Sequence, residues 1–124
     1  MIAAHLSNDD HGICHIAGVR ARATCEGGEL AVRLERPDGS AILPDQQLTM
    51  VTNDFMATGG DGLLDAIPGL IMRGRTETDE TLRDVIANEL AKRDKPLNPH
   101  DPQFFDPSAP RIVYPGKRPV RCQK

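Results

Sequence analysis

The chain has 124 residues and a formal net charge of −3 at pH 7. This charge argues against a general nucleic-acid-binding protein, because such proteins are basic. Aromatic residues make up only 3% of the sequence, so aliphatic side chains must form most of one small core. No segment has the ~20 apolar residues of a membrane span, and the N-terminus lacks the basic start of a secretory signal. As it stands, the sequence predicts no membrane association and a cytoplasmic chain.

The first third of the chain reads as a β-hairpin that follows a polar N-terminal arm. Residues 13–24 interleave small and apolar side chains with Arg20 and Arg22, which predicts a strand. The Glu-Gly-Gly-Glu sequence at 26–29 is typical of a hairpin turn. Apolar and polar side chains alternate over residues 30–35, and this period of two predicts a second, half-buried strand.

A further turn and strand lead into a glycine-rich loop. Asp38 and Gly39 are expected to form the turn, and residues 48–52 read as a short strand. Asn53 and Asp54 follow, and these residue types readily leave a β-ladder. The loop is therefore expected to begin directly after a strand end.

This loop contains the most informative pattern of the chain, an aromatic ring and a carboxylate beside three glycines. Phe55 and Asp61 are expected on opposite sides of a turn. Gly59, Gly60 and Gly62 permit positive φ angles and close backbone approach, so that free N–H groups face outward. The grouping suits a flat ligand with polar edges, such as a purine or pyrimidine. The simpler interpretation is an ordinary loop with a phenylalanine in the core.

Beyond the loop, residues 63–67 are expected to form a helical turn and residues 70–72 a short strand. One longer helix is predicted over residues 79–92 with Thr78 as its N-cap, because acidic residues begin it and basic residues end it. We expect its apolar face to pack in the core and not to form a groove for a partner. That face consists of Leu82, Val85, Ile86 and Leu90.

Prolines recur from residue 96 onward. Such a segment cannot be a regular helix or an interior strand, so residues 96–124 are expected to lie extended over a domain formed by residues 1–95. Phe104 and Phe105 either cover the edge of the core or place a second ring beside a base. The basic residues of this tail either contact a phosphate or are simply solvated. They are Arg111, Lys117, Arg118, Arg121 and Lys124.

Three cysteines, Cys14, Cys25 and Cys122, leave the pairing open. If one extended strand joined the first two, they would lie about 35 Å apart, beyond the ~7 Å limit between bridged Cα atoms. Either cysteine is able to reach Cys122 through the tail. Reduced thiols are nevertheless the simplest expectation.

Neither a metal site nor a catalytic group is expected in this chain. His5, His11, Cys14 and His15 lie near one another in the sequence. Their spacing matches no closed zinc module, and adjacent Cys14 and His15 would point to opposite faces of a strand. The serines lack the sequence context of a catalytic nucleophile.

The glycine-rich loop resembles the signature of the C-terminal, substrate-binding domain of the 5'-nucleotidase family. In that signature Asn-Asp-Phe or Asn-Phe runs into Gly-Gly-Asp-Gly, as residues 53–62 do here. The Ile-Ala-Gly-Val-Arg sequence at 16–20 resembles the hairpin that precedes the signature, and the similarity covers roughly residues 12–95. We expect an α+β fold, a mixed or mostly antiparallel sheet of about three to five strands with one main helix packed on it.

The resemblance implies that this domain recognises the nucleoside part of a nucleotide. Phe55 would stack on the base, and Asp61 would lie in the same pocket. The glycines of the loop and of the preceding hairpin would shape the pocket. These are Gly59, Gly60, Gly62 and Gly18.

The chain lacks the metallophosphatase domain that holds two divalent metal ions and performs hydrolysis in that family. It also lacks the first part of the substrate-binding domain, with its phosphate-contacting arginine and second stacking phenylalanine. The resemblance therefore implies a nucleotide-recognition part that is not catalytic by itself. It holds no cofactor of its own, and a separate metallophosphatase domain or chain would be its partner. Relatives are usually exported, which leaves the compartment open.

A second hypothesis is a structural or interaction module that no longer binds nucleotides. The missing half of the domain favours it, whereas the complete loop signature opposes it. An uncovered apolar edge is expected in either case, and a homodimer is one way to cover it.

Overall fold

The computed structural model describes residues 1–10, 12–62, 64–65, 67, 76–102, 104 and 106–123. The strand predicted at residues 70–72 lies outside these ranges, as do parts of the helical turn predicted at 63–67. His11, Phe105 and Lys124 also lie outside them.

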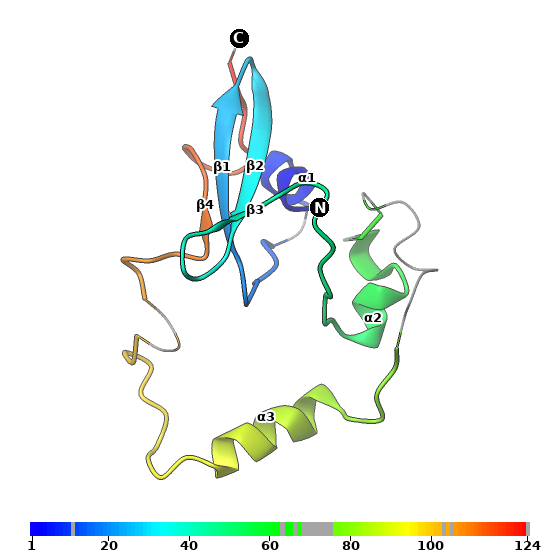
Figure 1. Cartoon of the computed structure of the whole chain (residues 1–124), viewed down its shortest axis with the longest axis vertical. Helices are drawn as coiled ribbons and strands as arrows, with labels where there is room; N and C mark the ends of the chain where they lie inside the picture. The colour runs from blue at the N-terminus through cyan, green and yellow to red at the C-terminus, as the bar shows by residue number, and fades with distance from the viewer. Residues whose placement is uncertain are drawn as a thin grey trace.

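A four-stranded sheet in the order β3-β2-β1-β4 forms the centre of the fold (Figure 1). β1 (Arg20–Glu26) pairs antiparallel with β2 (Glu29–Glu35), and β2 pairs antiparallel with β3 (Ala41–Ile42). β4 (Ile112–Val113) comes from the C-terminal segment and pairs parallel with β1. The predicted α+β class with a mixed sheet is confirmed.

The first hairpin forms where the sequence predicts it. Gly27 and Gly28 both have positive φ angles, 61° and 87°, which a tight two-residue turn between twisted strands requires. The strand predicted from residue 13 is wrong at its start, because β1 begins only at Arg20. Gly18 has φ 78°, a conformation that interrupts an extended chain just before the ladder with β2 begins.

The turn at Asp38 and Gly39 is also confirmed. Gly39 has φ 86°, and its N–H donates to the carbonyl of Arg36 at 2.9 Å. The N–H of Ser40 donates to the Asp38 carboxylate at 2.8 Å, and the two bonds together close the turn between β2 and β3. The strand predicted at residues 48–52 is wrong: these residues pair with no strand, and Val51 is 93% exposed.

The helix that covers the sheet is α1 (Ile2–Ser7), in the segment that the sequence analysis treats as a polar arm. It lies against β2 (Figure 1). Its Leu6 is fully buried and forms the core with Ala23 of β1 and Val120 of the C-terminal segment. The N–H of Val120 donates to the carbonyl of Leu6 at 2.8 Å, so the two ends of the chain meet at this core.

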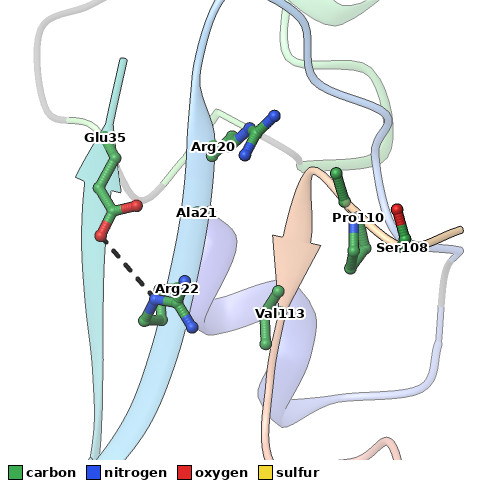
Figure 2. A pocket seen from close by; sticks show the side chains of 8 residues that line it. Arg20, Ala21, Arg22, Glu35, Ser108, Pro110 and Val113 are labelled. Atoms are coloured by element: carbon green, nitrogen blue, oxygen red, sulfur yellow. Dashed lines mark ion pairs between the residues drawn. The ribbon is translucent and has the colours of Figure 1, made fainter. Parts of the chain in front are cut away.

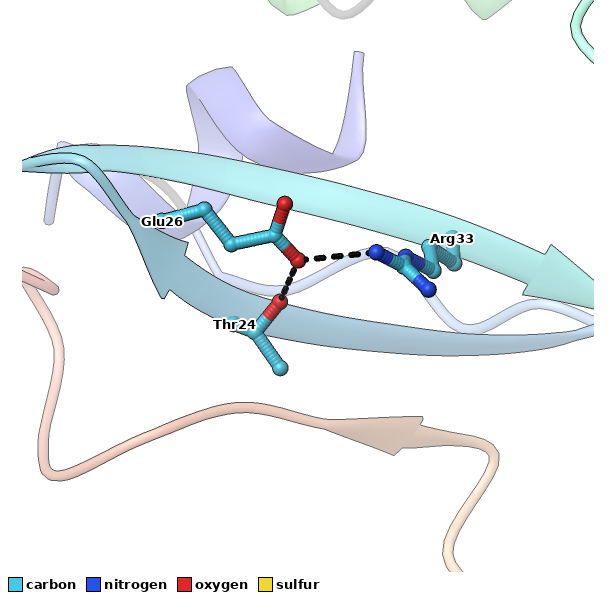
Figure 3. Close-up of polar contacts among 3 residues, drawn as sticks. All are labelled: Thr24, Glu26 and Arg33. Carbon is cyan, nitrogen blue, oxygen red and sulfur yellow. Dashed lines mark hydrogen bonds and ion pairs between the residues drawn. The ribbon is translucent and has the colours of Figure 1, made fainter.

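The opposite face of the hairpin is polar. The hydroxyl of Thr24 and the guanidinium of Arg33 both donate to the same carboxylate oxygen of Glu26, at 3.0 and 3.1 Å (Figure 3). Arg22 forms a longer ion pair of 3.8 Å with Glu35. These exposed pairs each contribute little to stability, about 0–1 kcal/mol. They show that only one face of the sheet carries the core.

The longest described helix, α3 (Leu82–Ala91), begins three residues later than predicted. Its N-cap is Thr81, whose hydroxyl accepts the N–H of Asp84 at 3.1 Å. The prediction that this helix packs on the sheet is wrong, because every residue from 76 to 100 is exposed and α3 lies well away from the strands (Figure 1). Within the described ranges, no helix is both long and apolar enough to cross a membrane.

A disulfide joins Cys25 at the end of β1 to Cys122, with the two Cα atoms 5.4 Å apart. The expectation of reduced thiols is therefore wrong for this pair. The pairing follows from β4, because the parallel strand brings the tail alongside β1 and Cys122 packs against the core. Cys14 is the cysteine left as a free, half-buried thiol.

Candidate functional site

The glycine-rich loop is built by a short helix, α2 (Asp54–Ala57), and a single 3-10 turn, η1 (Gly60–Gly62). The side chain of Asn53 accepts the N–H of Met56 at 2.8 Å and caps the start of α2. The hydroxyl of Thr58 donates to the carbonyl of Asp54 at 2.8 Å and closes its end. Gly59 follows with φ 95°, which reverses the chain toward η1. The residues that leave the expected strand therefore form a capped helical turn.

The ring of Phe55 lies directly against the backbone of Gly60. A Cβ atom on Gly60 would lie only 2.5 Å from Cε1 of this ring, a separation that real structures do not show. Glycine is therefore required at position 60 for the ring to lie where it does. Phe55 is nevertheless 55% exposed, so the rest of the ring faces solvent. The ring is not a core side chain.

Asp61 follows Gly60 and has φ 56° and ψ 13°, the left-handed conformation that aspartate tolerates better than most residues. Its side chain is exposed. Gly62 has φ 61°, and a Cβ atom there would lie 3.1 Å from a carboxylate oxygen of Asp65. A second carboxylate thus lies beside the loop. Asp65 is not among the site residues predicted from the sequence; its place four residues after Asp61 is the signal that could have identified it.

Most of the predicted site residues belong to this one loop. The Phe55 ring contacts Gly60, Asp61 follows Gly60, and Gly59 and Gly62 have positive φ angles. For Gly18, the structure shows no contact with the glycine-rich loop. This glycine lies in the segment before β1, and no described atom lies within 4 Å of the place its Cβ would take.

A separate cleft of about 260 Å³ lies between β1, β4 and the segment before β4 (Figure 2). Arg20, Arg22 and Glu35 line it from the polar face of the hairpin, with Ser108 and Val113 opposite. Arg22 pairs with Glu35 there, and Arg20 leaves the lining with one net positive charge.

The carboxylate of Asp106 adds a further negative charge close to this cleft. Hydrogen bonds from Ser108 lower the pKa of the Asp106 carboxyl, and the nearby charge of Arg20 lowers it further. The sequence analysis treated Arg20 and Arg22 only as strand residues.

Two arginines of the basic tail, Arg118 and Arg121, are bound to backbone carbonyls near the end of α1. Arg118 donates to the carbonyls of His5 and Asn8 at 3.1 and 2.8 Å, and Arg121 donates to the carbonyl of Ser7 at 2.9 Å. These carbonyls lie at the C-terminal end of α1, where cations are favoured. The arginines therefore fasten the tail to the first helix.

The structure also places Phe104 of the tail and potential metal ligands near the N-terminus. The guanidinium of Arg93 lies over the ring of Phe104, 4.4 Å from its centre, so this ring is held by the end of α3. His5 and Cys14 line one small hollow beside α1, while His15 is exposed. Within the described ranges, no group of three or more histidine, cysteine or acidic side chains gathers as metal ligands do.

No protein-family model, no curated protein and no solved structure matches this chain. The likeness of the loop to the 5'-nucleotidase signature thus rests on the residues of the loop and of the preceding hairpin.

Proposed function

We propose that the chain recognises the nucleoside part of a nucleotide through the loop at residues 53–62. It would do so as part of a substrate-binding domain like that of the 5'-nucleotidases. The observation that carries the proposal is the Phe55 ring, which lies against Gly60 and remains half exposed. Asp61 follows this glycine and is also exposed, so a ring face and a carboxylate are both open to solvent within one loop.

Each part of the loop has a distinct role in this proposal. The base stacks on the open part of the Phe55 ring, an interaction that contributes about 1–3 kcal/mol in other base-binding proteins. The carboxylate of Asp61 accepts a hydrogen bond from an amino group of the base or a hydroxyl of the ribose. Gly60 has no side chain, so the Phe55 ring is able to occupy the volume beside its backbone.

The expected affinity is low, because the proposal assigns a single stacking ring, Phe55. One stacking contact and one charged hydrogen bond together correspond to a dissociation constant on the order of 1 mM. Such binding suits a domain whose ligand is also held elsewhere. In this proposal, hydrolysis is performed by a metal pair on a separate metallophosphatase domain or chain.

Calorimetric or NMR titration with adenosine and uridine monophosphates tests the proposal, with and without a divalent metal ion. We expect saturable binding that Phe55→Ala weakens about tenfold, in line with the loss of one stacking contact. Leu97→Ala is the control, because it removes an apolar side chain of similar exposure outside the loop. Absence of saturation at about 10 mM nucleotide would refute the proposal. An equal loss in both variants would refute the assignment to Phe55.

A structural or interaction module is the second candidate, and the size of the exposed surface favours it. The chain exposes 10028 Å², whereas a compact protein of 13.5 kDa exposes about 6,500 Å². Exposed aliphatic side chains are common in the middle of the chain, including Leu43, Val51 and Leu97. If the chain binds no nucleotide but associates with another protein, the interaction module is the correct interpretation.

A further inference from the structure

The apolar face of α3 is exposed along the whole helix. Leu82, Val85, Ile86 and Leu90 are 64%, 40%, 49% and 41% exposed. Their spacing places them on one side of the helix, with Ile86 at the centre and Asn88 on the opposite side. An apolar stripe of this kind normally lies against another element.

The charges around α3 indicate which partner fits this stripe. Glu77, Asp79 and Glu80 precede the helix, whereas the residues after it are mainly basic, Lys92, Arg93 and Lys95 with one acid, Asp94. Lys92 also pairs with Glu89 of its own helix. Two copies of α3 that lie antiparallel bring the acidic end of each helix to the basic end of the other. Their helix dipoles also run in opposite directions, which favours the same arrangement.

The apolar positions fit the same arrangement. Leu82 and Leu90 are equally distant in sequence from Ile86, one before it and one after it. A twofold axis near Ile86 therefore places Ile86 beside its counterpart and Leu82 at the level of Leu90 in the other copy. Such a contact is self-complementary, as the interface of a closed dimer must be.

We propose that α3 is the contact of a homodimer, in which two copies of the helix pack antiparallel through this stripe. The proposal does not depend on nucleotide binding. Because α3 has only ten residues and is about 15 Å long, the contact is smaller than the 1,200–2,000 Å² of stable interfaces. We expect a dissociation constant of about 10–500 μM.

Sedimentation velocity of the full chain over a range of concentrations tests the dimer. We expect a shift from monomer to dimer that Ile86→Glu abolishes within the measured range, because it places two carboxylates at the twofold axis. Asn88→Glu is the matched control, since it adds the same charge on the opposite side of α3 and should leave the shift unchanged. Non-reducing electrophoresis excludes a covalent dimer through Cys14.

Charge reversal tests the antiparallel orientation. Asp79→Lys with Glu80→Lys, or Lys92→Glu with Lys95→Glu, should weaken the dimer several-fold. All four substitutions together should restore it, because opposite charges meet again across the two copies. The two ends of one helix are too far apart for that recovery to arise within a single chain.

A monomer at all concentrations up to about 1 mM would overturn the proposal. A dimer that Ile86→Glu leaves intact would do the same, since another surface would then hold it. Additive weakening in the fourfold variant would overturn the antiparallel orientation.

Discussion

At the scale of single residues, the close approach of Phe55 to Gly60 decides the form of the candidate site. The ring occupies the volume that any side chain at position 60 would need. The sequence predicts close backbone approach at Gly60, and in the structure the Phe55 ring is the group that approaches. Asp61 directly follows this glycine and has a left-handed conformation.

Gly60→Ala should displace the Phe55 ring without unfolding the chain. The ring is half exposed and free to swing outward, so we expect a loss of less than about 1 kcal/mol in the free energy of unfolding. Nucleotide affinity should fall about tenfold, as in Phe55→Ala. Chemical denaturation and titration of the same variant measure both quantities. Gly12→Ala is the control, because a Cβ there meets open space; equal effects of the two substitutions would contradict the prediction.

At the scale of elements, the helix that packs on the sheet is α1, whereas the sequence predicts that α3 does so. The apolar face of α3 is a sound helix signal, but nothing among the described residues covers it. The short α1 lacks a long periodic pattern, yet its Leu6 is fully buried. A hydrophobic stripe predicts that a helix will be buried by something, and does not predict which surface buries it.

Thr81→Ala should reduce the helix content of the monomer without lowering the temperature of its cooperative unfolding. The hydroxyl of Thr81 caps α3, and loss of such a cap costs a helix about 1 kcal/mol. An unpacked helix of ten residues is marginal by itself, so the far-UV circular dichroism signal should fall. Thr78→Ala is the control, because Thr78 is the cap that the sequence predicts and the structure does not use. An equal loss of signal in both variants would place the helix start at residue 79.

At the scale of the whole molecule, contacts between the two ends of the chain hold the fold together. The disulfide, β4 and the arginines of the tail all join residues that lie about a hundred positions apart. The described residues between β3 and β4 lie mostly at the surface, and α3 lies well away from the sheet (Figure 1). Stability should therefore depend on the few links between the ends.

Replacing Cys25 and Cys122 by serine should destabilise the chain strongly. A disulfide that closes a loop of this length, with a sequence separation of 97, contributes about 4–5 kcal/mol in the chain-entropy account. Urea unfolding of the double variant measures the loss, and Cys14→Ala is the control that leaves the disulfide in place. A loss below about 1 kcal/mol would show that β4 and Val120 hold the tail without the bond.

The sequence by itself determined the local features of this protein. The Glu-Gly-Gly-Glu turn, the Asp38-Gly39 turn, the alternating strand at 30–35 and the existence of α3 depend on neighbouring residues, whose preferences a linear pattern contains. The positive φ angles of Gly59 and Gly62 in the glycine-rich loop also follow from such a pattern. Strand boundaries and the apparent strand at 48–52 were not predictable in this way, because a strand exists only where another edge is free to pair.

Only the tertiary structure decided which distant residues meet. It paired Cys25 with Cys122, placed β4 parallel to β1, buried Leu6 against Val120 and left the apolar face of α3 uncovered. The physical reason is the same in each case. These contacts bring together segments far apart in the chain, and the free energy that selects them comes from joint burial and hydrogen bonding, which no local pattern records.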